Sequence, residues 1–136
     1  MKRITIWAAL IAMLSCLQFF ANPQAASVGT NGGPAENKKT QNITVWCDYN
    51  NPKTKHTVKP GQSSEAWSRC RLDTDQASAT AKSCVKVGGL GATYKKVNGW
   101  WQVPANKKVK IVGVSTMKFY NYTKDRCGSK KNYPLT

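Results

Sequence analysis

The sequence predicts an all-β fold: a small, disulfide-bonded antiparallel β-sandwich or barrel of about seven or eight short strands. Three observations lead to this prediction. From residue 42 onward, short runs alternate apolar and polar residues with a period of two, and no helical period stands out. Turn residues (Gly, Pro and Asn) separate these runs about every 8–12 residues. Four cysteines lie in the same part of the chain, a number that suits two disulfides.

The first 26 residues have the three parts of a secretory signal peptide. Lys2 and Arg3 form a basic start, an apolar run extends from Ile4 to Phe20, and small residues around Ala26 suit a peptidase. A membrane anchor stays open, because the run is about as long as the shortest spans. So does a lipoprotein, because MLSC, ending at Cys16, loosely resembles a lipobox. We expect an exported protein, periplasmic or extracellular and bacterial, whose mature chain has no transmembrane segment.

Residues 27–41 (SVGTNGGPAENKKTQ) contain one valine and no other large apolar side chain. Such a segment cannot bury enough surface to offset the entropy lost on ordering, so we expect a flexible tether. Residues 42–136 then form one β-sandwich-like domain.

The first expected strands are separated by clear turns. In NITVWCDY (42–49), Ile43 and Val45 alternate with polar positions and give a mostly apolar face. NNPK turns the chain, and KHTVKPG (55–61) gives a short strand closed by a Pro-Gly turn. SSEAWSRCRL (63–72) is the third expected strand, with Cys70 on one face and Trp67 on the other.

The later expected strands begin with AKSCVKV (81–87), in which two valines oppose Cys84 and Lys86. A GGLG turn leads to ATYKKV (92–97), and Asn98-Gly99 predicts a type I′ hairpin into WWQV (100–103). KKVKIVGV (107–114) and TMKFYNY (116–122) form the last pair. One helix around residues 74–83, where Ala and Gln are frequent, is the alternative to an all-β chain.

The cysteines predict two disulfides, and strand alternation suggests their pairing. Cys47 and Cys70 both fall on apolar faces, which favours a bridge in the core. Cys84 lies on a lysine-bearing face and Cys127 in the polar tail, which favours a clamp on the tail. Four cysteines permit three pairings in all. There is no CxxC spacing and the chain has a single histidine, so we expect no metal site and no cofactor.

Charge is the strongest compositional feature. The net charge is +15, and without Lys2 and Arg3 the 19 basic against 6 acidic residues leave +13. Such a surface attracts anionic polymers, acidic protein surfaces or, by peripheral contact, anionic membranes. Charge alone also fits solubility and general adhesion with no dedicated partner.

An aromatic–basic surface is the best functional signal. Aromatic rings between cations suit stacking on nucleobases or sugar rings, while the cations hold phosphates, sulfates or carboxylates. Only one of Trp100 and Trp101 can face a simple core, because neighbouring strand residues point to opposite faces. The other is a hairpin cap or part of the ligand surface. The expected ligand-binding residues are Trp46, Trp67, Arg69, Arg71, Lys82, Lys86, Trp101, Lys107 and Lys108.

Catalysis has weaker support. His56 and Glu65, with Arg69 and Arg71, would be an acid–base–cation cluster of the kind a ribonuclease needs, if His56 lay across from Glu65. A lone histidine in a basic strand is more often a solvated strand residue, and Glu65 more often pairs with a neighbouring Lys or Arg, so we expect no enzyme and no catalytic residue. The sequence therefore predicts an exported cationic binding protein for an envelope glycan or lipopolysaccharide, a nucleic acid or an acidic protein. A secreted cationic toxin or antimicrobial factor is the alternative, and a ribonuclease-like enzyme is the third.

Overall fold

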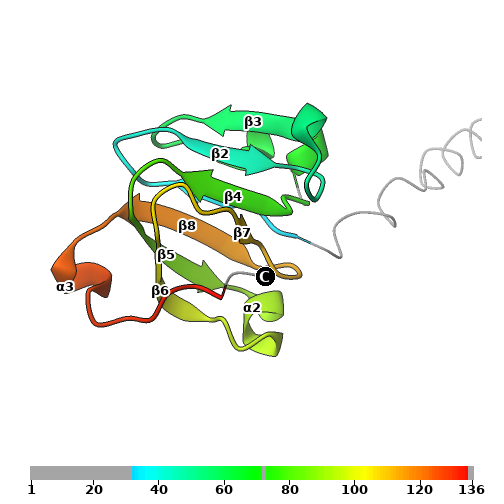
Figure 1. The fold of residues 1–136 in the computed structure, drawn as a ribbon. Helices are drawn as coiled ribbons and strands as arrows, with labels where there is room; N and C mark the ends of the chain where they lie inside the picture. The colour runs from blue at the N-terminus through cyan, green and yellow to red at the C-terminus, as the bar shows by residue number, and fades with distance from the viewer. Residues whose placement is uncertain (1–31, 72, 135–136) are drawn as a thin grey trace, which may run out of the picture.

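Two four-stranded β-sheets pack face to face in the computed structural model, which describes residues 32–71 and 73–134 (Figure 1). The predicted all-β, disulfide-bonded class is confirmed, with eight strands in the described residues. The expected signal peptide, 1–26, and the first residues of the expected tether lie outside these ranges.

The first sheet has the strand order β1-β8-β5-β6. Its members are β1 (Ala35–Asn37), β8 (Thr116–Asn121), β5 (Ser83–Gly88) and β6 (Gly99–Val103). Strand β5 pairs antiparallel with both β8 and β6, whereas β1 pairs parallel with β8.

The second sheet has the order β3-β2-β4-β7, and all its pairs are antiparallel. Its strands are β3 (Lys55–Val58), β2 (Ile43–Trp46), β4 (Gln76–Ala79) and β7 (Val109–Lys110). Short helices connect the strands. They are η2 (Pro52–Thr54), η3 (Ser64–Ala66), η4 (Ser68–Cys70), α2 (Leu90–Tyr94) and α3 (Lys124–Cys127).

The core lies between the sheets and takes alternate residues from each strand. Val85, Met117 and Phe119 of the first sheet and Val45 and Val109 of the second belong to one buried cluster. Because side chains alternate along a strand, the residues between them face outward. Burying each such side chain contributes about 1.5–3 kcal/mol, which fixes the register and hence what the outer faces display.

The structure confirms both predicted disulfides. Cys47–Cys70 joins the end of β2 to η4 and is part of the core cluster. Cys84–Cys127 joins the outward-facing side of β5 to α3 and thereby holds the tail against the first sheet. Two disulfides are typical of chains that fold in an oxidising compartment. In the part of the chain that the structure describes, no helix has the length and apolar character needed to cross a bilayer.

The expected tether is corrected from residue 32 onward, because β1 is an edge strand of the first sheet. Ala35 and Asn37 are fully buried. The Asn37 amide donates to the carbonyls of Val58 and Gln41, each at 2.8 Å, and its Oδ1 accepts from Lys39 N. A small residue and a fully hydrogen-bonded amide therefore order a segment that lacks large apolar side chains.

Residues 63–72 are not the expected strand. The Ser63 side chain accepts a hydrogen bond from Glu65 N and caps η3, and η4 follows directly after Trp67. Local side-chain bonds of this kind compete with strand pairing. The expected opposition of Cys70 and Trp67 across a strand is therefore wrong, although Cys70 does reach the core.

Three further expectations differ from the structure. Residues 92–97 form no strand, because α2 covers the first three of them and a turn follows, and no two-residue hairpin precedes Gly99. The segments expected to pair last, 107–114 and 116–122, contribute β7 and β8 to different sheets. The alternative helix around 74–83 is replaced by β4.

Candidate ligand-binding site

The outer face of the first sheet carries one row of charged and aromatic residues across all four strands. Glu36 pairs with Lys118, Lys118 with Lys86, and Lys86 with Trp100 in the backbone register. We call these four residues the Trp100 row. The core residues that alternate with Lys86 and Lys118 fix its direction, so the row points away from the core.

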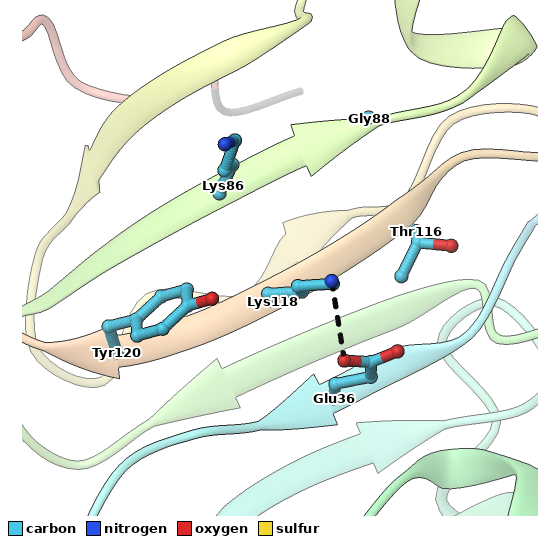
Figure 2. A pocket seen from close by; sticks show the side chains of 6 residues that line it. All are labelled: Glu36, Lys86, Gly88, Thr116, Lys118 and Tyr120. Atoms are coloured by element: carbon cyan, nitrogen blue, oxygen red, sulfur yellow. Dashed lines mark ion pairs between the residues drawn. The ribbon is translucent and has the colours of Figure 1, made fainter.

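A shallow pocket of about 380 Å³ lies over this row (Figure 2). Figure 2 shows that its lining comes from three neighbouring strands, with Lys118 directed at Glu36. The Lys118 Nζ lies 3.9 Å from Glu36 Oε2, and Lys38 Nζ lies 3.6 Å from the same oxygen. The lining residues are Glu36, Lys86, Gly88, Thr116, Lys118 and Tyr120.

Gly88 and Thr116 are cross-strand partners at one end of the pocket. A Cβ added to Gly88 would meet no atom within 4 Å, so the space above it is open. At this end the Thr116 hydroxyl is the polar side-chain group of the lining, and Lys86 and Lys118 follow it along the pocket.

Tyr120 lines the opposite end of the pocket, and Trp100 lies next to Tyr120 outside the lining. The rings of Trp100 and Tyr120 lie 5.2 Å apart between centroids, tilted by 53°. Lys86 Nζ lies 5.6 Å from the Trp100 ring centroid, and the Arg126 guanidinium lies 4.8 Å from that of Tyr120. Arg126 comes from α3, which the Cys84–Cys127 bridge ties to the same face. Ring faces and cations therefore alternate along the site.

The nine predicted ligand-binding residues do not form one surface. Lys86 alone belongs to the Trp100 row. Trp46 and Lys108 lie together on the second sheet, where Lys108 Nζ is 4.4 Å from the Trp46 ring centroid. Lys82 lies over the Tyr122 ring at 4.2 Å, and Lys107 is exposed in the turn before β7.

The structure also decides which tryptophan faces outward. Trp101 packs against the core, donates its Nε1–H to Val97 O at 2.6 Å and contacts Tyr133 edge-on. Trp100 therefore takes the outward position. Trp101, which was predicted for the ligand surface, thus lies on the core side of β6, because its cross-strand partner Val85 faces the core.

Trp67, Arg69 and Arg71 lie in or beside the 3₁₀ turns, away from the Trp100 row. Trp67 packs against the core. Arg69 is bound to Asp48, with Nε 2.8 Å from Oδ2. Arg71 is exposed at the end of η4. Their expected position on one strand face does not exist in this fold.

The acid–base pair considered for catalysis is not assembled. His56 stacks on Trp67, with centroids 4.7 Å apart and an interplanar angle of 13°. Glu65 is exposed in η3, and within residues 32–71 and 73–134 no hydrogen bond or ion pair joins it to His56.

A buried lysine–serine pair is the other group of chemical interest. Lys39 Nζ lies 2.8 Å from Ser83 Oγ, and burial lowers the pKa of Lys39. Ser83 is fully buried and donates its hydroxyl hydrogen to Ala81 O. A substrate has no access to this hydroxyl, so the pair connects β5 to the segment after β1 as a structural contact.

Residues Glu36, Trp100, Thr116, Lys118, Tyr120 and Arg126 were missed by the sequence-based prediction. Alternation within residues 116–122 carried a usable signal, since Thr116, Lys118 and Tyr120 share one face of β8. Glu36 had no such signal, because its segment was expected to be a tether.

Two carboxyl groups near Asp48 predict a pH dependence of stability. Burial and the Asp73 charge raise the pKa of Asp75, and burial and Asp48 raise the pKa of Asp73. A carboxyl whose pKa is higher in the folded state weakens folding as the pH rises through that pKa. Asp75→Asn removes one of the two charges, so we expect it to raise the free energy of unfolding at pH 7 by about 0.5 kcal/mol, a small gain because solvent screens both groups.

Urea unfolding at several pH values checks this prediction. The gain of Asp75→Asn should vanish below about pH 4, where the unfolded-state carboxyl is already protonated. A variant that is less stable than the parent protein at pH 7 contradicts it.

Comparisons with protein-family models, curated proteins and solved structures found no match to this chain.

Proposed function

We propose that this chain is an exported, non-catalytic protein that binds an acidic polysaccharide through the Trp100 row and its pocket. The observation that carries the proposal is an open pocket lined by Lys86, Lys118 and Tyr120, with Trp100 and Arg126 next to the Tyr120 ring. Export is supported by the signal-peptide pattern of the first 26 residues and by the two disulfides.

Glu36 favours a sugar polymer over a nucleic acid. Its carboxylate accepts hydrogen bonds and donates none, and it lies in the pocket between two lysines. Hydroxyl groups on a sugar ring can donate to it, while the lysines hold the carboxylates or sulfates of the polymer. The sugar–phosphate chain of DNA carries no free hydroxyl group between its phosphates, so it offers Glu36 no such donor. The ring faces of Trp100 and Tyr120 offer the stacking surface.

Fluorescence anisotropy with a labelled polygalacturonate oligomer tests the proposal at about 150 mM salt. We expect Lys86→Ala and Lys118→Ala each to weaken binding about three- to tenfold and to lower the salt slope by about one unit, because each removes one polymer contact. Lys53→Ala is the matched control. It removes the same charge from η2, beside the second sheet, and should change the affinity less than about twofold.

Gly88→Phe separates a site from general charge attraction. It fills the open floor of the pocket without changing any charge, and Gly88 does not have the left-handed backbone that a side chain would strain. We expect it to weaken binding at least about fivefold through loss of pocket volume. Unchanged binding in Gly88→Phe, or equal losses in Lys53→Ala and Lys86→Ala, would contradict the proposal. Tighter binding of a poly-dT oligomer than of polygalacturonate would replace the sugar polymer with a nucleic acid.

A further inference from the structure

The second sheet carries a row that matches the Trp100 row in kind. Trp46 pairs with Lys55 on one side and with Gln76 on the other, and Gln76 pairs with Lys110. We call these four residues the Trp46 row. It crosses all four strands, as the Trp100 row does. Val45, Ala77 and Val109 alternate with it and lie in the core, so the Trp46 row faces outward.

Cations surround the Trp46 ring. Lys108 Nζ lies 4.4 Å and Lys55 Nζ 5.9 Å from its centroid, and Lys110 Nζ lies 5.5 Å from the Tyr49 ring. Asn50 connects this group, because its Oδ1 accepts from both Lys108 Nζ and Gln76 Nε2. The arrangement again alternates ring faces with ammonium groups.

Hydroxyl groups border this row on the same face. Thr44 pairs with Thr57 on β3 and with Ser78 on β4, one pleat along from Trp46. These are neutral donors and acceptors, which suit a hydroxylated polymer lying beside the lysines. The four residues of the Trp46 row include no carboxylate, and Asp75 interacts electrostatically with Lys110 at the β7 end of the row.

The two rows point away from each other. Their sheets cover opposite sides of one core, with the second sheet above and the first sheet below in Figure 1. Packed sheets lie about 10 Å apart, before the outward side chains are added on each side. A stretch of polymer seated on one row therefore cannot touch the other row without bending around the sandwich.

We infer that this protein is bivalent: the Trp46 row is a second, independent site for the same class of acidic polysaccharide, and one molecule bridges two polymer chains. The inference rests on the proposed function of the Trp100 row, since it assigns the same ligand chemistry to both faces. The losses expected for Lys86→Ala, Lys118→Ala and Gly88→Phe refer to the Trp100 site, so they are measured in the Trp46→Ala/Lys55→Ala/Lys108→Ala background, where the second site is absent. Two sites that face in opposite directions bind two separate polymer chains. The second site therefore bridges chains instead of raising the affinity for a single chain.

A two-step capture experiment tests this inference. Surface-bound polygalacturonate first captures the protein, and labelled soluble polygalacturonate is then added after washing. The parent protein should retain the labelled chain. Trp100→Ala/Lys86→Ala/Lys118→Ala and Trp46→Ala/Lys55→Ala/Lys108→Ala each remove one face, so each should still be captured but retain at least about tenfold less labelled chain. Near-ultraviolet circular dichroism checks that both variants are folded.

The outcomes separate the two proposals. Capture of the parent protein without retention of the labelled chain overturns bivalency and leaves the proposed function standing. Absence of capture overturns both. Full retention by either single-face variant also overturns bivalency, because self-association through one site would then do the bridging. Stronger retention of labelled poly-dT than of labelled polygalacturonate by the captured parent protein would reassign the Trp46 row to nucleic acid.

Discussion

The Cys84→Ala/Cys127→Ala variant is expected to unfold with a free energy about 4 kcal/mol lower than that of the parent protein. The bridge joins residues 43 positions apart, and a closed loop of that length restricts the unfolded chain by about this amount. For a domain of this size, the loss corresponds to a midpoint of thermal unfolding about 15–30 °C lower. Urea titration without reductant, on parent and variant side by side, measures the difference.

The same variant should also weaken binding at the site proposed over the Trp100 row. Cys127 ends α3, and α3 presents Arg126 to the Tyr120 ring. Without the bridge, α3 is no longer covalently joined to β5. Arg126 is then less firmly held beside the Tyr120 ring. We therefore expect weaker polygalacturonate binding even at temperatures where the variant remains folded.

The Cys47→Ala/Cys70→Ala variant is the natural comparison. Its bridge spans 23 positions, so the expected loss is about 3.5 kcal/mol, slightly smaller than that of the other pair. This bridge lies in the core, away from α3, and its removal should leave the position of Arg126 unchanged. A loss below about 1 kcal/mol for Cys84→Ala/Cys127→Ala would show that α3 is held by other contacts.

Alternation within a run was the part of the sequence that predicted structure well. The valines of β5 and the apolar residues of β2 enter the core as their period-two pattern predicts. The pairing of Cys47 with Cys70 and of Cys84 with Cys127 was also predicted correctly. For Cys70 the reason was wrong, because it reaches the core from a 3₁₀ turn and not from a strand.

Segments ordered by hydrogen bonds were not predictable by the same means. Strand β1 is held by the Asn37 amide and by pairing with a strand some 80 residues later, and neither contact leaves an apolar pattern. The η3 turn depends on a Ser63 cap, which alternation does not register. These are cases in which specific partners outweigh the local pattern.

The candidate site required the register between strands. Aromatic and basic residues were predicted to carry the function, but the sequence could not say which of them share a face. Glu36, Lys118, Lys86 and Trp100 are adjacent only because four strands align in one register, which the buried side chains on the opposite face select.

The Gln102→Glu variant is expected to lose about 3 kcal/mol of stability at pH 7. Gln102 lies in β6 with 9% of its surface exposed, and its Nε2 donates to the carbonyls of Cys127, Gly128 and Lys130 at 2.8–3.2 Å. A glutamate carboxylate only accepts hydrogen bonds, so it would face these carbonyl oxygens with no donor between them. An ionised group left unpaired in a buried position costs more than a neutral one.

The loss should depend on pH in a defined direction. Carbonyl oxygens and burial both favour the protonated acid, so the pKa of the introduced carboxyl should be higher in the folded state than in the unfolded chain. The variant should then be nearly as stable as Gln102→Leu below about pH 4 and should lose stability as the pH rises. Gln102→Leu removes the same donor without adding charge, and its loss of about 1–2 kcal/mol should be independent of pH.

Parallel urea titrations of both variants from about pH 4 to 8 separate two effects on stability: the loss of the hydrogen-bond donor and the burial of a carboxylate. The backbone of Gln102 also bonds to Lys131 and Tyr133, so this residue holds the whole segment after α3 against β6. If the two variants have the same pH dependence, the tail has moved and solvated the carboxylate. In that case the Cys84–Cys127 disulfide, and not Gln102, keeps α3 and Arg126 at the outer face of the first sheet.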